Sequence, residues 1–117
     1  MSLFPPYSSD EPARAEVDAM PGATVLEFGT DWCGICQSAQ RSIEDALAAH
    51  KSGPPLRHLK IEDGRGRPLG RSFGIKRWPT LVMLQDGKEV ARVVRPAGMQ
   101  EIAQALARLG AEPALEG

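Results

Sequence analysis

Both cysteines of this chain, Cys33 and Cys36, lie three positions apart in the segment Asp31-Trp32-Cys33-Gly34-Ile35-Cys36. If a helix begins at the first cysteine, positions i and i+3 lie on one face of it, close enough for the two sulfurs to form and break a disulfide. The first sulfur then lies at the helix N-terminus, where the helix dipole and free N–H groups stabilise a thiolate. A Cys-x-x-Cys pair that forms the whole cysteine complement therefore predicts thiol–disulfide exchange.

Two other roles for the pair stay open at this point. It could form an inert structural disulfide, which a reducing cytosol disfavours. It could bind zinc, but a zinc site needs about four ligands, and His50 and His58 are the only histidines in the chain. We favour the redox pair, and we expect no metal ion and no cofactor other than the Cys33–Cys36 disulfide itself.

The residues around the pair predict the elements that must position it. An apolar, strand-like run covers 23–28, and Gly29-Thr30-Asp31 forms a short connection. From Gly34 onward apolar residues recur at spacings of three and four, which predicts a long helix from about Cys33 to His50. The expected inner face comprises Cys36, Ala39, Ile43, Ala46, Leu47 and His50, and most of the outer face comprises Gln37, Gln40, Arg41, Glu44 and Asp45.

A second motif lies downstream of the cysteines. Phe73-Gly74-Ile75 is followed by Trp78-Pro79-Thr80 and then by the apolar run Leu81 to Leu84. Two motifs in this order, about 45 residues apart, are more specific than either one alone. Together with Phe28 and the turn at Asp86-Gly87-Lys88, they make the chain resemble the thioredoxin family over roughly 13–109.

The resemblance implies a role for Pro79. In that family the matching proline has a cis peptide bond and lies against the redox cysteines, and proline is the residue that adopts cis bonds readily. Proline also lacks an N–H, which leaves the neighbouring backbone open to pair with a substrate strand. A trans proline at the start of a strand is the alternative.

The order of predicted elements gives an α/β fold. Strands are expected at 24–28, 57–62, 80–85 and 89–94, the last two as a hairpin. Helices are expected at 10–20, 33–50, 68–73 and 99–109, the last with Ile102, Ala103, Leu106 and Leu109 inward. This order predicts a thioredoxin fold, a mixed central sheet of about four strands with helices on both faces. We expect an extended N-terminal segment over 1–9, one domain over 10–110 and a tail over 111–117, with no obvious leading edge strand.

The motif and the resemblance imply a thiol–disulfide oxidoreductase that reduces protein disulfides. Cys33, exposed ahead of the helix body, attacks the substrate disulfide and forms a mixed disulfide. Cys36, one turn inside the helix and more buried, then attacks the Cys33 sulfur and releases the reduced substrate. A disulfide oxidase or isomerase, and a redox-inactive interaction module with the same fold, remain alternatives.

Glu27 is a candidate proton shuttle for Cys36. It interrupts an apolar strand six residues before Cys33, at a position where the family usually has a buried aspartate. Desolvation raises the pKa of such a carboxyl, which suits proton transfer directly or through a water. A strand acid that reaches solvent or an ion pair is the alternative. The family often pairs this acid with a lysine; the matching position is His58, with Lys60 on the same face, and a histidine would make Cys36 activation respond to pH near 6–7.

The resemblance also implies a substrate-binding surface. Trp32 would form part of it, and Trp78 would expose its backbone N–H and C=O to the substrate, although both could be ordinary core aromatics. The other residues expected to contact substrate are Gly34, Ile35, Pro79 and Thr80. Ile35 and Gly29 stand where the family often has proline and tryptophan, so the chain fits a thioredoxin-like relative better than a general thioredoxin.

Charge and hydropathy limit the partners. The net charge of −1 implies no nucleic-acid partner, and no apolar run approaches the roughly 20 residues of a membrane span. Residues 57–77 are locally basic; a solvated surface is the favoured interpretation, and selection of an acidic partner by Lys76 and Arg77 is the other. We expect a monomer with a disulfide-containing protein substrate and an upstream thiol reductant. No signal peptide is visible, which favours the cytoplasm, or the periplasm if a signal peptide has been removed.

Overall fold

The computed structural model describes residues 4–50 and 55–110, and its central feature is one mixed sheet. The strands are β1 (Ala23–Gly29), β2 (Leu56–Glu62), β3 (Thr80–Gln85) and β4 (Lys88–Val94), in the spatial order β2-β1-β3-β4. β1 pairs in parallel with β2 and antiparallel with β3, and β3 pairs antiparallel with β4. All seven residues of β1 are buried, because this strand lies inside the sheet and both of its faces are covered.

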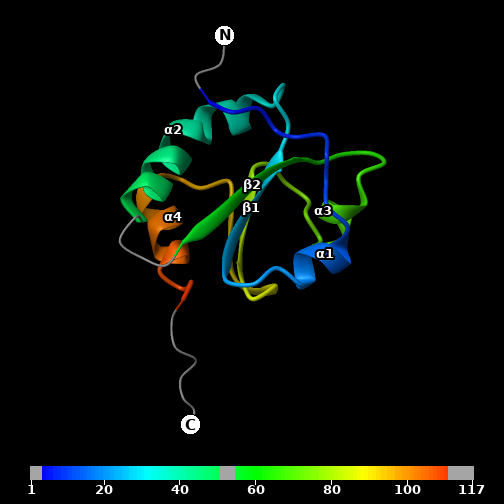
Figure 1. Cartoon of the computed structure of the whole chain (residues 1–117). Helices are drawn as coiled ribbons and strands as arrows, with labels where there is room; N and C mark the ends of the chain where they lie inside the picture. Colours follow the sequence, from blue (N-terminus) through cyan, green and yellow to red (C-terminus); the bar gives the residue numbers. More distant parts are fainter. Residues whose placement is uncertain (1–3, 51–54, 111–117) are drawn as a thin grey trace.

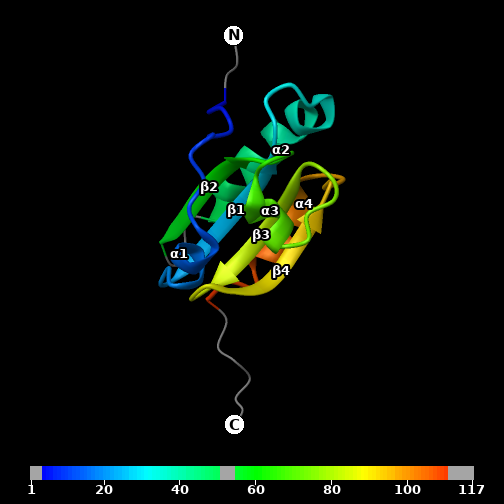
Figure 2. The same ribbon diagram turned by 90° about the vertical axis from the view of Figure 1, so that its right-hand side faces the viewer.

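Helices cover both faces of the sheet (Figures 1 and 2). α2 (Gly34–Ala49) and α4 (Met99–Leu106) lie on one face, and α1 (Arg14–Asp18) and α3 (Pro68–Ser72) lie on the other. The predicted fold class and element order are therefore confirmed. Within the described part of the chain, every helix is too short or too polar to cross a membrane.

Two apolar cores result, one on each face. Successive strand residues point to opposite faces, so each strand supplies both cores. The core under α2 and α4 contains Val25, Ile43, Leu81, Met83, Ile102 and Leu106. The core under α1 and α3 contains Val17, Leu26, Phe28, Ile61, Leu69 and Val82. The alternation places Glu27 of β1 on the α2 side, between two residues that point to the other face.

Several sequence expectations differ from the structure at the helices. α1 is shorter than the expected 10–20, and α4 ends before the expected 109. Ala103 is exposed whereas Ala105 is buried, because the inward stripe of α4 follows 102, 105, 106 and 109. Gln40, expected on the outer face of α2, is buried. The expected tail over 111–117 lies outside the described residues.

The N-terminal segment pairs with the sheet through one isolated bridge. Ser8 lies parallel to Ile61 at the outer edge of β2. The Ser8 N–H donates to the Lys60 carbonyl at 2.9 Å, and the Glu62 N–H donates to the Ser8 carbonyl at 2.9 Å. No full leading strand forms among residues 4–13, in agreement with the sequence expectation. The bridge nevertheless fixes the path of the preceding residues, including Tyr7.

The β3–β4 turn gives a prediction about Gly87. Its φ is +79°, and a Cβ there would lie 2.0 Å from the Asp18 carbonyl oxygen, a backbone atom that cannot yield easily. Gly22 has a similar φ of +75°, but a Cβ there would meet nothing within 4 Å. Gly22→Ala should therefore cost about 1–2 kcal/mol from the left-handed conformation alone. Gly87→Ala should cost a further 1–3 kcal/mol, roughly, from overpacking.

Urea denaturation of the two variants measures this difference directly. Equal losses of stability in Gly87→Ala and Gly22→Ala would show that the contact with Asp18 does not constrain the turn.

Candidate active site

The two cysteines lie at the N-terminus of α2, as the motif predicts. Cys33 is the N-cap residue, and its Sγ accepts a hydrogen bond from the Cys36 N–H at 3.2 Å. Both are free thiols; Cys33 is half-buried and Cys36 is buried. One sulfur is thus reachable from outside, and the second lies directly behind it on the same helix face.

Burial changes the chemistry of the inner thiol. Desolvation raises the pKa of Cys36 to about 12, and the neighbouring Cys33 thiol raises it as well. Hydrogen bonding from the Thr30 backbone and from Tyr7 lowers this pKa, but by less. Cys36 therefore remains a neutral thiol at ordinary pH, and it needs a proton acceptor before it can act as a nucleophile.

The loop that contains Pro79 packs beside the cysteine loop. The Trp78–Pro79 peptide bond is cis, as the resemblance implied. Trp32 and Trp78 meet edge to face with ring centroids 5.6 Å apart, which joins the two loops. Trp32 is 74% exposed and Ile35 is 46% exposed, so neither is a core residue. Pro79 and Thr80 are buried. Gly34, the first residue of α2, is exposed.

The backbone of Trp78 is less open than expected. Its carbonyl, which we expect to be exposed to substrate, already accepts one hydrogen bond, from Arg95 Nε at 2.9 Å. The Arg95 N–H also donates to the Pro79 carbonyl at 2.8 Å. The Trp78 indole donates to Asp63 at 2.9 Å. A substrate strand that pairs with the Trp78 carbonyl would therefore share this oxygen with the Arg95 side chain or displace it.

The basic stretch of the sequence reaches this loop. Lys76 and Arg77 are exposed. Lys76, Arg71 and Trp78 help to line a surface groove of about 520 Å³. Whether this surface is simply solvated or selects an acidic partner stays a prediction.

Glu27 lies in the middle of β1, is fully buried and accepts three hydrogen bonds. Tyr7 Oη donates to its Oε2 at 2.5 Å, and Gln40 Nε2 donates to the same oxygen at 2.9 Å. His58 Nε2 lies 2.9 Å from Glu27 Oε1. His58, the residue that the sequence analysis matched to the family's lysine, is therefore a partner of Glu27. Burial raises the pKa of Glu27, but the hydrogen bonds from His58, Tyr7 and Gln40 outweigh burial and lower it. The expectation of a raised pKa is therefore wrong.

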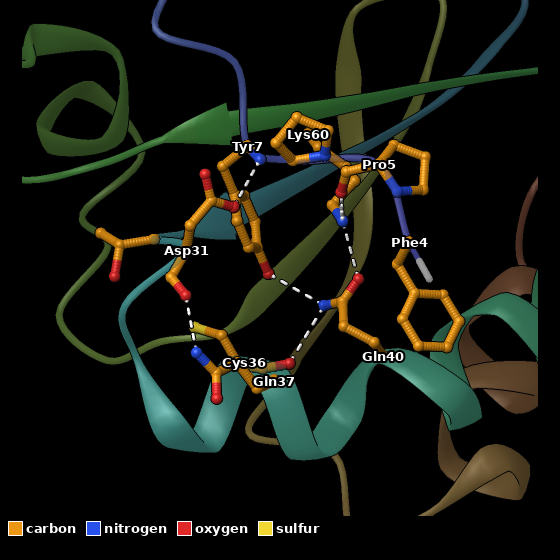
Figure 3. A pocket seen from close by; sticks show the side chains of 10 residues that line it. Phe4, Pro5, Tyr7, Asp31, Cys36, Gln37, Gln40 and Lys60 are labelled. Atoms are coloured by element: carbon orange, nitrogen blue, oxygen red, sulfur yellow. Dashed lines mark hydrogen bonds between the residues drawn. The ribbon is translucent and has the colours of Figure 1, made fainter. Parts of the chain in front are cut away.

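Sequence reasoning missed Tyr7 and Gln40. The Gln40 amide donates to the Cys36 carbonyl at 3.0 Å as well as to Tyr7 Oη at 3.2 Å, and its oxygen accepts from Lys60 Nζ at 2.7 Å (Figure 3). Two sequence signals pointed here. Gln40 lies four positions after Cys36 and three before Ile43, which is the spacing of the inner helix face. Gly29 ends a buried strand, where a glycine often marks the close approach of another group, and here both Cys36 Sγ and the Tyr7 ring make that approach.

Tyr7 is held in place by two further contacts. Its N–H donates to Asp31 Oδ1 at 2.9 Å, next to the cysteine motif. Lys60 Nζ lies 4.7 Å from the centre of its ring, and also donates to the Pro5 carbonyl. A cavity of about 770 Å³ opens between this segment and α2, and Tyr7, Cys36 and Gln40 are among its lining residues (Figure 3). Cys36 borders this cavity, although its own side chain is fully buried.

Metal binding finds no support in the arrangement. Among residues 4–50 and 55–110, no group of three or more His, Cys, Asp and Glu side chains is placed to hold a metal ion. The buried His50 Nε2 has no hydrogen-bond partner, and His58 is bonded to Glu27.

Comparison with known proteins agrees with this geometry. The family model described as Thioredoxin matches residues 8–108. The reduced thioredoxin 2 of Pseudomonas aeruginosa PAO1 has a TM-score of 0.77 and 49% identity, over 89% of this chain and 94% of that chain. The thioredoxin of Chlamydia muridarum is 39% identical over 74 residues, which are 62% of this chain and 69% of that protein.

More distant redox proteins are also similar. Protein disulfide-isomerase A3 of Gallus gallus is 28% identical over 81 residues, 69% of this chain and 16% of that protein. In this chain a Cys-x-x-Cys pair begins a helix, and the Trp78–Pro79 peptide bond beside it is cis. The chain belongs to the thioredoxin family, and it is a thiol–disulfide oxidoreductase in the general sense of that family.

Proposed function

We propose that this chain reduces disulfides in protein substrates. The observation that carries the proposal is the position of Cys33, half-exposed at the N-cap of α2 with the buried Cys36 thiol behind it. A half-exposed sulfur can meet a substrate disulfide, and a sulfur one turn inside the helix can reach the first without a change of fold.

The reaction proceeds in two exchanges. The Cys33 thiolate attacks one substrate sulfur, the substrate S–S bond breaks, and the departing thiolate takes a proton from water. A mixed disulfide now joins Cys33 to the substrate. Cys36 loses its proton and attacks Cys33 Sγ, the mixed disulfide breaks, and the second substrate thiolate leaves. Two electrons have passed from the Cys33–Cys36 dithiol to the substrate, and an upstream thiol reductant restores the dithiol.

The rest of the proposal concerns the cofactor, the oligomeric state, the cellular compartment and the residues that contact the substrate. The cysteine pair itself carries the electrons, so no further cofactor enters. All the residues used belong to one chain, which suits a monomer. A reducing direction requires thiol donors, which the cytoplasm supplies. We expect the substrate to contact the exposed Trp32 and Ile35 and the part of the Trp78–Thr80 segment that it can reach, since Pro79 and Thr80 are buried.

Disulfide oxidation or isomerisation is the second candidate. The similarity to protein disulfide-isomerase A3 favours it, because the same two exchanges run in either direction. For this couple about 30 mV corresponds to 1.4 kcal/mol, so modest differences in thiolate stability decide the direction. An interaction module with incidental cysteines would require neither exchange.

Trapping the mixed disulfide tests the proposal. Cys36→Ser should still attack through Cys33 but cannot resolve the intermediate, so it should accumulate as a covalent adduct with a peptide disulfide. Cys33→Ser should form no adduct, because the remaining thiol is buried and protonated. Intact mass spectrometry after an acid quench measures both. Equal adduct yields, or no adduct from Cys36→Ser, would contradict the assignment.

The ionisation of Glu27 gives a prediction about stability and pH. Its pKa is lowered in the folded state, so it stabilises the fold above its unfolded value, about 4.3, and that contribution is lost as pH falls through the lowered value. The free energy of unfolding should therefore fall below about pH 5 in the wild type. Glu27→Gln should lack this part of the decline.

Urea denaturation at a series of pH values measures the effect. Glu44→Gln, on α2 and outside the hydrogen bonds of Glu27, is the matched control and should follow the wild-type profile. If Glu27→Gln also follows the wild-type profile, folding does not lower the pKa of Glu27.

A further inference from the structure

The hydroxyl of Tyr7 lies between the inner thiol and the buried carboxylate. It donates to Glu27 Oε2 at 2.5 Å, and on its other side it faces the same space beside Gly29 as the Cys36 thiol. Among the side chains that the structure describes, no hydrogen bond joins Cys36 to Glu27 directly; the Glu27 oxygens are taken by Tyr7, Gln40 and His58. Tyr7 Oη is therefore the Glu27 donor that is placed next to the thiol.

Gly29 makes this approach possible. A Cβ at position 29 would lie 2.7 Å from Cys36 Sγ and 2.8 Å from both Tyr7 Cζ and Tyr7 Oη. Both groups thus converge on the space that any other residue would fill. The convergence is fixed from several directions, because Asp31 holds the Tyr7 backbone and Lys60 lies over the ring.

The protonation of Tyr7 suits a relay. Burial and the Glu27 carboxylate raise the pKa of Tyr7 far above its ordinary value. The residue therefore stays a neutral hydroxyl, which can accept one proton while it gives another away. Gln40 donates to one lone pair of the phenol oxygen, and the second lone pair can accept from the thiol while the O–H donates to Glu27. Catalytic hydrogen bonds are often long in the free enzyme and shorten in the complex with substrate, and we expect this of the contact between Cys36 and Tyr7.

We propose that Tyr7 relays the proton of Cys36 to Glu27 when Cys36 resolves the mixed disulfide. This rests on the proposed function. The S–H bond of Cys36 breaks and its proton passes to Tyr7 Oη, while the Tyr7 O–H proton passes to Glu27 Oε2. The Cys36 sulfur forms its bond to Cys33 Sγ, and the bond between Cys33 and the substrate sulfur breaks. The departing substrate thiolate, directly or through water, then takes the proton that Glu27 holds, so Tyr7 and Glu27 end as they began.

A purely structural Tyr7 would have different consequences. The side chain fills space beside Cys36 and bonds to Gln40, so its loss could disturb both cysteines equally. A relay acts in the second exchange alone, because the first uses Cys33. The two roles therefore separate when the two exchanges are timed individually.

Tyr7→Phe tests the relay, because it keeps the ring and removes the hydroxyl. Reduced protein is mixed with a peptide disulfide, and samples taken over time are quenched in acid and alkylated. Intact mass spectrometry of these samples gives the rate of mixed-disulfide formation and the rate of its resolution. The relay predicts an unchanged first rate and a second rate lower by about 100-fold, the lower end of general acid–base contributions. The resolution rate of the wild type should also be lower in D₂O than in H₂O, with a solvent isotope effect that indicates transfer of more than one proton. Tyr7→Phe should lose this multi-proton isotope effect.

Ser8→Ala is the matched control. It removes a hydroxyl from the next residue, whose backbone pairing to β2 remains, and both rates should equal those of the wild type. A folded Tyr7→Phe with a wild-type second rate overturns the relay, and so does an equal fall in both rates, which indicates structural support only. A wild-type protein that forms no mixed disulfide overturns the proposed function and the relay with it.

Discussion

A single negative charge in the middle of the sheet organises the site. Glu27 lies in the most buried strand, where an ionised carboxylate without partners would cost several kcal/mol. Three donors compensate it: Tyr7 from the N-terminal segment, Gln40 from α2 and His58 from β2. The carboxylate thus draws together elements far apart in sequence at the place where Cys36 is buried. Removing a donor would leave part of that charge unpaired.

The same constraint explains the N-terminal segment. Tyr7 is the only tyrosine of the chain, and residues 4–9 contribute no regular element except one bridge to β2. Their path is set instead by specific contacts to Asp31, Lys60 and Glu27. A segment without regular secondary structure can still have one well-defined path when its single buried residue, here Tyr7, completes a hydrogen-bond network. Here the N-terminal segment lines one side of the cavity next to Cys36 and places the Tyr7 hydroxyl beside the inner thiol.

The sequence was most informative where local pattern controls structure. The spacing of Cys33 and Cys36 predicted their place on α2, and alternating apolar residues predicted the four strands to within about one residue of their ends. The position of Glu27 in an apolar strand correctly indicated a buried acid, and His58 was correctly chosen as its neighbour. These inferences depend on residues close in sequence or on adjacent strands.

What the sequence could not supply depends on long-range contacts. Tyr7 meets Glu27 across 20 positions and Gln40 across 33, and Tyr7 belongs to no periodic pattern that could have indicated these contacts. The prediction that Gln40 faces outward was wrong. A buried polar side chain is tolerated only where it finds hydrogen-bond partners, and the partners of Gln40 come from distant parts of the chain that the local pattern does not reveal. The pKa of Glu27 was misjudged for the same reason: desolvation follows from the strand alone, but the three opposing hydrogen bonds do not.

The reduction potential of the Cys33–Cys36 couple tests the central claim most directly. Equilibration with glutathione buffers, followed by alkylation and intact mass measurement, gives the ratio of dithiol to disulfide. The account predicts one intramolecular, two-electron couple more reducing than the cytosolic glutathione pool, about −220 to −260 mV by extraction. A potential near that of strong disulfide oxidants, about −120 mV, or no intramolecular disulfide at all, would contradict it.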